Sequence, residues 1–301
     1  MQVAGAAHVI PVILNGLSGN GESSAQPESL ERSFRQAGVA ARVIVLRPGE
    51  DLREVAHRAL SDRPPVMVAG GGDGTLNGVA EVLCGTETAL GVLPTGTLNH
   101  FARDLRIPAD IDEAVRIIAA GRRSRIDVGD VNGRCFLNNS SLGLYPNVVR
   151  ERTRQQRRFG RSKRAAMVWA TLAALRRSRL LDLRLQLEDG ERSYRAPFVF
   201  VGNNQYHMEG FDIGTRERLD AGYLSVYTTQ RCTAGGLAML FLHALFGRLR
   251  QADDFTALRA RTVQVDTPRS RLLVATDGEV SVMETPLRFR IRPRCLEVIA
   301  P

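Results

Sequence analysis

The sequence predicts a chain of two parts, an α/β domain with a mainly parallel sheet followed by an antiparallel β domain with helical insertions. From residue 8 to about residue 125, short apolar runs alternate with segments whose apolar residues recur at helical spacing. This alternation is typical of βαβ units. After residue 125, Asn-Gly and Asp-Gly turn signals separate runs of alternating apolar and polar residues. That second pattern is typical of antiparallel hairpins.

The first part is predicted to contain four strands, each followed by a helical segment. The predicted strands are His8–Leu14, Arg42–Leu46, Val66–Ala69 and Leu90–Leu93. Helical spacing is marked in turn by Leu30 and Phe34, by Val55 and Ala59, by Val79 and Leu83, and by Ile111, Val115 and Ile118. Parallel strands joined by helices therefore account for this part of the chain.

The second part begins with a predicted hairpin, in which Asn132-Gly133 separates Ile126–Val131 from Cys135–Leu137. A second hairpin is expected at Asp189-Gly190, after a run from Leu181 to Leu187 in which leucines alternate with polar residues. The further predicted strands are Phe198–Val201, Tyr223–Thr228, Arg261–Val265, Leu272–Ala275 and Arg288–Ile291. Helices are expected at Ala165–Leu175 and Gly236–Leu249.

Composition limits the protein class. With 44% apolar and 24% charged residues, the chain resembles soluble globular proteins. It contains no run of ~20 apolar residues that would span a bilayer, and its start lacks the basic residues of a secretory signal. We therefore expect a cytoplasmic protein. Its four cysteines, which form no CxxC pair, are Cys84, Cys135, Cys232 and Cys295. We expect them to be reduced and mostly buried, without a zinc site or a disulfide.

The strongest motif is a glycine-rich turn, Gly70-Gly71-Gly72-Asp73-Gly74-Thr75, between the Val66–Ala69 run and a helical segment. Glycine lets the backbone turn tightly and approach a ligand without a Cβ. The helix that follows offers free N–H groups and a positive dipole end to phosphate, and Asp73 adds a carboxylate that can hold Mg²⁺. The structural alternative is a tight turn with an aspartate helix cap. The motif is neither a Walker A loop nor a Rossmann fingerprint.

Two other polar loops are predicted at the same edge of the sheet. Pro94-Thr95-Gly96-Thr97-Leu98-Asn99 follows the Leu90–Leu93 strand, and Asn15-Gly16-Leu17-Ser18-Gly19 ends the first strand. Loops after parallel strands emerge at the carboxyl edge, where ligands bind. Alone, each segment would be an ordinary surface turn. Together with the glycine-rich turn, they predict one binding site.

A third signal, Asp277-Gly278-Glu279, follows the Leu272–Ala275 strand far along the chain. An Asp-Gly pair is usually a turn. Two carboxylates that flank a glycine can instead provide a base for an attacking hydroxyl.

In this order, the segments NGLSG, GGGDGTLN, PTGTLN and DGE resemble the diacylglycerol kinase-like lipid kinase family, which includes sphingosine kinases and bacterial lipid kinases. The resemblance extends over nearly the whole chain, through Phe136-Leu137-Asn138-Asn139, Val201-Gly202-Asn203 and Asp220-Ala221-Gly222-Tyr223-Leu224. It implies Mg²⁺-assisted, in-line transfer of phosphate from ATP to a lipid hydroxyl such as that of diacylglycerol. It also implies an α/β ATP-binding domain at residues 1–125, to which a strand at 287–301 returns, and a β-sandwich-like lipid-substrate domain at 126–286.

The resemblance further implies roles for single residues. Asp277 would be the general base, Glu279 would support its hydrogen bonds, and Asp73 would position the Mg²⁺ of the nucleotide. The residues expected to contact ATP are Asn15, Ser18, Gly19, Gly71, Gly72, Asp73, Gly74, Thr75, Thr95, Gly96, Thr97 and Asn99. Asp220 falls where some bacterial members hold a structural Mg²⁺, so the expected metal ligands are Asp73 and Asp220.

Three positions depart from the family pattern. His100 replaces the usual acidic residue after Asn99, and histidine is not a hard oxygen ligand for Mg²⁺. Gly16 replaces a proline, which should loosen its loop. In Asp220-Ala221, one acidic residue stands where many members have two.

Other functions remain open at this point. NAD kinases share the GGDGT motif, although PTGTLN and DGE match lipid kinases better. A pseudokinase that binds ATP or lipid without transfer is supported by His100 and opposed by Asp73, Asp277 and Glu279. The net charge of +9 fits nucleic acid, but no recognisable nucleic-acid-binding module is present, so we expect no such partner.

The basic run Arg150–Arg164 is either a solvated face or a docking segment for anionic lipid. We expect a membrane lipid as substrate, transient contact with an anionic membrane, and a peripheral location at the inner membrane surface. The sequence identifies neither the lipid nor the oligomeric state.

Overall fold

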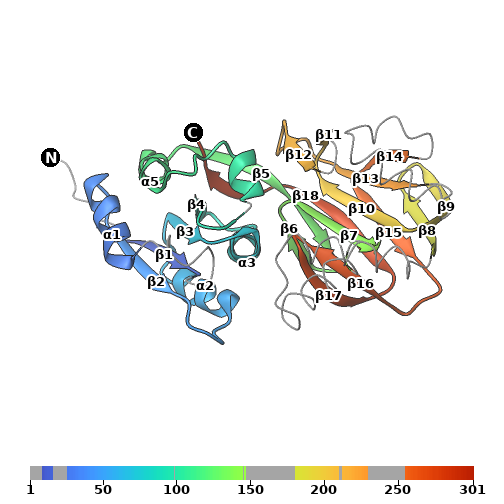
Figure 1. Ribbon diagram of the computed structural model, residues 1–301, viewed down its shortest axis with the longest axis horizontal. Helices are drawn as coiled ribbons and strands as arrows, with labels where there is room; N and C mark the ends of the chain where they lie inside the picture. The colour runs from blue at the N-terminus through green and yellow to red at the C-terminus, as the bar shows by residue number, and fades with distance from the viewer. Residues whose placement is uncertain are drawn as a thin grey trace. The chain divides into compact units, whose positions relative to one another are not determined.

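The computed structural model describes residues 9–15, 26–97, 99–144, 146, 180–209, 212–229 and 255–301. The chain divides into two compact units, Met1–Val128 with Arg294–Pro301, and Gly129–Pro293 (Figure 1). The first division lies inside strand β5 (Arg123–Val131), close to the expected boundary at residue 125, and the returning segment begins at Arg294 rather than at 287. The basic run Arg150–Arg164 and both predicted helices of the second part lie outside the described residues.

The first unit contains the predicted parallel sheet. Its strands are β1 (Ile10–Leu14), β2 (Ala41–Val45), β3 (Val66–Gly70) and β4 (Ala89–Leu93). They pair in parallel in the order β2-β1-β3-β4, and β18 (Leu287–Ile299) then adds its last residues beside β4 through the pair Val298 and Leu90. β1, β3 and β4 are buried along their whole length, as expected for parallel strands covered on both faces.

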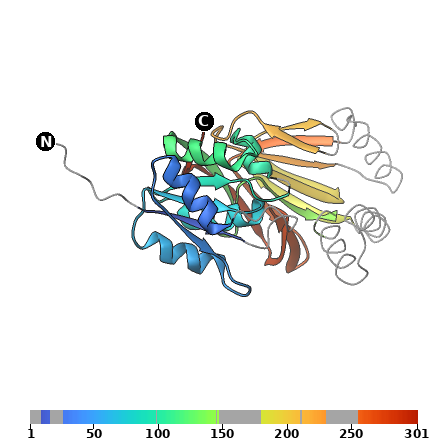
Figure 2. The same cartoon turned by 60° about the vertical axis from the view of Figure 1, so that its left-hand side comes forward.

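Among the described residues of this unit, five helices accompany the sheet. They are α1 (Pro27–Gln36), α2 (Leu52–Leu60), α3 (Asp73–Leu83), α4 (His100–Asp104) and α5 (Ile111–Ala120). α1 packs on α5, as the blue and green helices of Figure 2 show, and α2 packs on α3. Arg53 of α2 donates two hydrogen bonds to Glu81 of α3, at 2.8 and 3.1 Å. Within the described ranges, every helix is too short or too polar to span a bilayer.

The strand order creates a site for a ligand. From β1 the chain first adds β2 on one side of the sheet and then crosses to add β3 on the other side. Such a reversal is a topological switch point, at which the loops that follow the two central strands diverge and leave a crevice. The loops after β1, β3 and β4 therefore emerge next to one another at the carboxyl edge, as the sequence predicted.

The second unit contains two antiparallel layers. One is a six-stranded sheet in the order β14-β13-β10-β7-β16-β17. Its strands are β7 (Asn139–Gly143), β10 (Phe198–Asn203), β13 (Leu224–Thr229), β14 (Phe255–Ala260), β16 (Arg271–Thr276) and β17 (Glu279–Glu284). The other layer runs from the first part of β18 through β15 (Thr262–Asp266) and β8 (Leu181–Leu187) to β9 (Gly190–Ala196). A separate hairpin joins β11 (Tyr206–Glu209) to β12 (Asp212–Arg216).

A single apolar core lies between these two layers. The six-stranded sheet contributes Leu142, Val201, Val226 and Val274, and the other layer contributes Leu183, Leu185, Val263, Val265 and Phe289. β8 alternates buried and exposed residues along its length, as its leucine pattern predicted. The predicted fold class, an α/β unit followed by an antiparallel β unit, is confirmed.

Both predicted hairpins form. β5 pairs with β6 (Arg134–Phe136) around Asn132 and Gly133, which both have positive φ, as a primed two-residue turn requires. β8 pairs with β9, and Gly190 opens β9. A Cβ on Gly129 would overlap the Phe136 ring across the first hairpin, so glycine is needed there.

Several strands were not predicted, and β7 is the most instructive. Its sequence, NSSLG, carries little apolar character, yet Ser140 and Ser141 are fully buried because strands pair on both sides of it. Burial by neighbouring strands thus overrode a weak local preference for strand. β11, β12, β14 and β17 were missed as well.

The expectation of reduced cysteines was wrong for one pair. Cys84, at the end of α3, and Cys295, on β18, form a disulfide with their Cα atoms 5.3 Å apart. The two residues are 211 positions apart in sequence. Their pairing depends on the return of β18 to the first unit, which cysteine spacing cannot reveal. Cys135 is buried and free, and Cys232 lies outside the described residues.

We expect the double substitution Cys84→Ala and Cys295→Ala to lower the free energy of unfolding by up to about 5 kcal/mol, because the disulfide closes a very long loop. Urea unfolding followed by circular dichroism, with and without dithiothreitol, measures this effect. Reductant should destabilise the wild type and leave the double variant unchanged, while Cys135→Ala, the control, should keep the response to reductant. Equal unfolding midpoints for wild type and double variant without reductant would contradict the disulfide.

Candidate active site

The glycine-rich turn forms the link between β3 and α3. Gly72 is the N-cap of α3 and supplies no side chain to bind the free N–H groups of the first turn. A Cβ on Gly71 would lie 2.5 Å from Thr75 Oγ1, so glycine lets Thr75 fold beneath the turn. The uncapped helix start therefore offers N–H donors and the positive end of the dipole to an anion.

The first strand contributes Asn15 to the same place. Its side-chain amide donates to Thr75 Oγ1 at 3.1 Å, and its backbone N–H donates to Gly70 O at 3.0 Å. These bonds join the end of β1 to the glycine-rich turn. Two residues predicted for this site, Ser18 and Gly19, lie outside the described residues.

The loop after β4 lies directly against the glycine-rich turn. A Cβ on Gly96 would overlap Gly72 Cα and lie 2.9 Å from Gly72 N, so only glycine permits this approach. Asn99 adopts a left-handed conformation, with φ of 50°. Its amide nitrogen donates to Pro94 O and Gly96 O, both at 2.9 Å, which holds the loop in shape.

One buried polar atom of this loop has no partner among the residues that the structure describes. Asn99 Oδ1 is buried and accepts no hydrogen bond from the residues that the structure describes. A buried acceptor without a donor costs about 1–3 kcal/mol, and native structures keep few such atoms. The atom lies among the loops that the sequence predicts as a binding site, where a ligand donor can satisfy it.

Asp73 joins the two loops. Its carboxylate accepts the backbone N–H of Phe101 at 3.2 Å and that of His100 at 3.4 Å, at the start of α4. These are long hydrogen bonds, so the carboxylate is oriented without being fully engaged. Asp73 thus adds a negative charge where two glycine-rich turns meet.

His100 does not substitute for a carboxylate here. Its Nδ1 lies 2.8 Å from Nη2 of Arg103 on the same short helix. An arginine guanidinium can only donate, so Nδ1 is the acceptor of this hydrogen bond. Where the resemblance implies an acidic residue, this chain therefore has an imidazole that is bound to an arginine.

These loops suit a nucleotide that carries its own metal. Among the described residues, no group of three or more His, Cys, Asp or Glu side chains forms a metal centre. Mg²⁺ is commonly held through one or two carboxylates together with phosphate oxygens. Asp73, the N–H groups of α3 and the small residues around Gly72 and Gly96 fit that kind of site.

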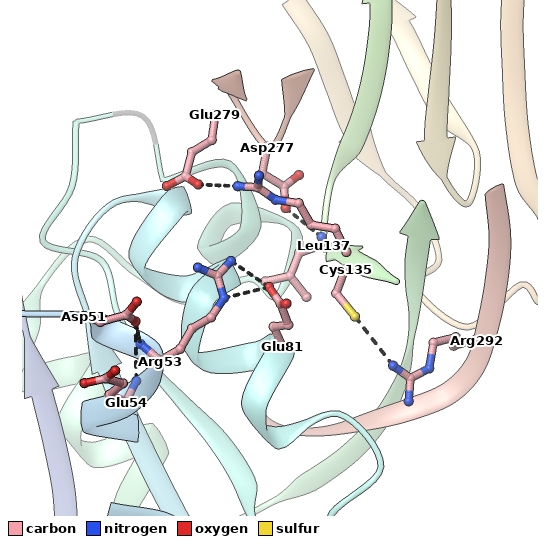
Figure 3. A network of polar contacts seen from close by, with 10 residues as sticks. Asp51, Arg53, Glu54, Glu81, Cys135, Leu137, Asp277, Glu279 and Arg292 are labelled. Carbon is pink, nitrogen blue, oxygen red and sulfur yellow. Dashed lines mark hydrogen bonds and ion pairs between the residues drawn. The ribbon is translucent and has the colours of Figure 1, made fainter. Parts of the chain in front are cut away.

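In the second unit, Asp277 starts the turn between β16 and β17. Its carboxylate accepts three backbone N–H groups, that of Leu137 at 2.7 Å, which Figure 3 shows, and those of Asn138 and Asn139 at 2.9 Å each. Asp277 and Gly278 both have positive φ, as a tight hairpin turn requires. The FLNN segment and the DGE segment, which are far apart in sequence, are thus brought together. Hydrogen bonds from the three N–H groups stabilise the ionised carboxylate.

Glu279 lies one residue beyond that turn and binds Arg134 of β6 at 2.7 Å (Figure 3). The residue after Arg134, Cys135, accepts through Sγ from Arg292 at 3.5 Å. Glu279 is half exposed, so it anchors β17 to β6 without closing off its own carboxylate.

Asp220, the other predicted metal ligand, pairs with Arg218 at 3.1 Å. The hydrogen bond to Asp220 raises the pKa of the Arg218 guanidinium above its usual value. A metal role for Asp220 stays a prediction.

Sequence reasoning missed one buried cation, Arg216 at the end of β12, which is 4% exposed. It donates to Leu137 O, Asn203 O and Asn138 Oδ1. Asn138 and Asn203 lie in segments that resemble the family, but nothing distinguishes Arg216 among the many arginines of the sequence.

Comparison with known proteins agrees with these motifs. Residues 9–131 match the model of the diacylglycerol kinase catalytic domain, and residues 143–300 match that of the YegS C-terminal NAD kinase beta sandwich-like domain. A diacylglycerol kinase of Staphylococcus aureus (strain bovine RF122 / ET3-1) is 27% identical over 296 residues, which cover 96% of this chain and 91% of the relative. The enzyme of strain JH9 is 28% identical over 251 residues, 82% of this chain and 78% of that protein.

The fold also matches two crystal structures of proteins from Bacillus anthracis str. Sterne. The first superposes with a TM-score of 0.76 at 20% identity and covers 98% of both chains. The second, described as a diacylglycerol kinase, has a TM-score of 0.71 at 18% identity and covers 98% of this chain and 97% of its own. These likenesses establish the two-unit fold.

We expect Gly96→Ala to separate the loops after β3 and β4. The added Cβ collides with backbone, so the free energy of unfolding should fall by about 1–3 kcal/mol and ATP binding should weaken. Gly72→Ala is the matched variant, because its Cβ meets only Gly96 Cα, at 3.9 Å. It should keep the unfolding midpoint of the wild type and still weaken ATP binding if the N–H groups of this turn hold the phosphates, because the added methyl group lies on the turn. Urea unfolding and calorimetric titration with a non-hydrolysable ATP analogue measure both, and a Gly96→Ala variant as stable as the wild type would contradict the close approach.

Proposed function

This chain belongs to the diacylglycerol kinase-like lipid kinase family, and we propose that it transfers the γ-phosphoryl group of ATP to the hydroxyl of diacylglycerol or a related lipid alcohol. The observation that carries the proposal is the meeting of three loops at the carboxyl edge of the first unit. Gly72 and Gly96 are in contact there, Asp73 lies between the loops, and the start of α3 is uncapped.

In this proposal the loops of the first unit hold the nucleotide. Backbone N–H groups of Gly72, Asp73 and Gly74 bind phosphate oxygens, and Thr95, Thr97 and Asn99 contact the rest of the nucleotide through their polar groups. Bound Mg²⁺ would neutralise the charge that develops on the transferred group. Asp73 is the carboxylate available to hold it.

Asp277 acts in this proposal as the general base for the lipid hydroxyl. The three N–H groups around it fix the orientation of the carboxylate. A base must be placed within hydrogen-bond reach of the proton that it takes. Glu279, through its ion pair with Arg134, supports the turn that carries Asp277. The phosphoryl transfer itself needs positioning more than covalent chemistry from the protein.

The family supports a proposal for the substrate and for the location of the protein. We propose that the lipid is reached at the surface of a membrane, with the protein as a peripheral component on the cytoplasmic side. The net charge of +9 supports attraction to anionic lipid headgroups.

One observation favours a second function, the binding of nucleotide and lipid without transfer. Position 100 is a histidine, bound to Arg103 through Nδ1, so the site has one carboxylate fewer than the family pattern implies. Retention of Asp73 and of the network around Asp277 favours the active kinase.

We expect label from γ-labelled ATP to appear in one member of a panel of lipid alcohols in mixed micelles with Mg²⁺. Asp277→Asn should lower the rate by about 10²–10⁴-fold, because the amide cannot take a proton. The control is Asp189→Asn, an exposed carboxylate in another hairpin turn of the same unit, bound to Arg192. Transfer to no lipid despite measurable ATP binding would favour the non-catalytic function.

We also expect His100→Asp to lower the Mg²⁺ concentration needed for half-maximal activity. It restores a second carboxylate beside Asp73, and carboxylate oxygens are the preferred protein ligands of Mg²⁺. Titration of the kinase reaction with MgCl₂ at fixed ATP measures the change, with His57→Asp on α2 as the control. An unchanged Mg²⁺ dependence would place position 100 outside the metal environment.

A further inference from the structure

One peptide group in the second unit lies between a buried cation and the proposed base. Arg216 Nη1 donates to the carbonyl oxygen of Leu137 at 2.6 Å. The N–H at the other end of the same peptide, that of Asn138, donates to Asp277 Oδ1 at 2.9 Å. The Leu137–Asn138 peptide therefore connects the guanidinium to the carboxylate through two hydrogen bonds in line.

Further bonds hold this peptide in place. Asn203 donates its side-chain amide to Leu137 O at 2.8 Å and its backbone N–H to Asn138 O at 2.9 Å. Arg216 Nη2 donates to Asn138 Oδ1 at 3.0 Å. The carbonyl of Leu137 thus accepts from two donors, which uses both of its lone pairs.

Arg216 is itself positioned by its surroundings. Its guanidinium donates to Asn203 O at 3.1 Å and stacks 5.3 Å from the centre of the Tyr206 ring. That ring lies over Gly202, where a Cβ would come within 2.8 Å of it. Arg216, Asn203 and Tyr206 are all buried, so the geometry is fixed by packing as well as by hydrogen bonds.

The hydrogen bonds of Arg216 to the Leu137–Asn138 peptide affect the Asp277 carboxylate in two ways. A peptide whose carbonyl accepts strong donors becomes a better N–H donor, because hydrogen bonds in a chain polarise one another. The guanidinium remains charged at any relevant pH, and its attraction for a carboxylate is weakly screened inside a protein. Both effects orient Asp277 and strengthen the donors that hold it.

We propose that Arg216 is a positioning residue for Asp277, acting through the Leu137–Asn138 peptide. This inference rests on the proposed role of Asp277 as general base. It predicts that loss of Arg216 lowers kcat, because the base loses its orientation. The KM for ATP should not change, since the loops that hold the nucleotide belong to the other unit.

Steady-state kinetics with the lipid alcohol that takes up label in the panel test this role. Arg216→Met should lower kcat by about 100-fold, the cost of misplacing a catalytic group by about 1 Å, at unchanged KM for ATP. Arg216→Lys should recover part of the loss, because lysine keeps the charge and one donor. Arg259→Met is the matched control, since Arg259 also stacks on a tyrosine, Tyr223, and donates to an amide oxygen, that of Gln205, but lies on β14. A kcat for Arg216→Met equal to that of the control would overturn the proposal.

A second measurement needs no catalysis and separates this inference from the proposed function. In the wild type, the amide protons of Asn138 and Asn139 should resonate downfield and exchange slowly, and Asp277→Asn should shift both. Arg216→Met and Arg216→Lys should shift Asn138 more than Asn139, whose N–H does not belong to the peptide that Arg216 binds. If wild type transfers no phosphate but these shifts occur, the proposed function fails and the connection stands. Unchanged amide signals in a folded Arg216→Lys variant would overturn the connection itself.

Discussion

Strand β18 is the constraint on which both units depend. Its first residues pair with β15 and complete one layer of the β unit, and its last residues lie beside β4 of the parallel sheet. Without this return, β4 would present an open sheet edge, which natural proteins avoid. The return is fixed at several points, by the Cys84–Cys295 disulfide, by the bond from Arg294 N to Asp127 at 2.9 Å and by that from Gly85 N to Cys295 O at 2.7 Å. The α/β unit is therefore complete only when the last residues of the chain have been added.

The sequence predicted the features that local chemistry dictates. The glycine-rich turn directly after a buried strand could be predicted as a close backbone approach, whereas the contact that requires glycine at position 96, with Gly72 Cα, became visible only in the structure. Long-range partners were not predictable in the same way. The disulfide joins residues 211 positions apart, and Arg216 reaches Leu137 over 79 positions. One arginine among many carries no mark of burial in the sequence, because Arg216 is buried among partners that the fold brings to it, Leu137, Asn138, Asn203 and the ring of Tyr206.

The two candidate sites differ in whether their polar groups already have hydrogen-bond partners. In the first unit the loops are closed by their own hydrogen bonds, yet Asn99 Oδ1 is left buried without a donor among the described residues, and α3 begins without a side-chain cap. Those groups are suited to a ligand that brings both donors and negative charge. In the second unit the carboxylate of Asp277 already accepts three N–H groups. The first site is thus prepared to bind, and the second is prepared to hold one charged group in a fixed direction.

A site suited to bind a ligand and a second site that holds one oriented carboxylate are what phosphoryl transfer is expected to need. The reaction gains most from groups that are oriented before the substrate arrives, since no reorganisation is then needed when charge develops. A free carboxylate on an exposed Asp-Gly turn would sample several rotamers, and ordering it would cost conformational entropy at each turnover. Backbone N–H groups cannot rotate away as side-chain donors can, so the FLNN segment holds Asp277 at little further entropic cost. The buried network of Arg216, Asn138 and Asn203 contributes to the same orientation. It holds the Leu137–Asn138 peptide, and the N–H of that peptide holds the Asp277 carboxylate.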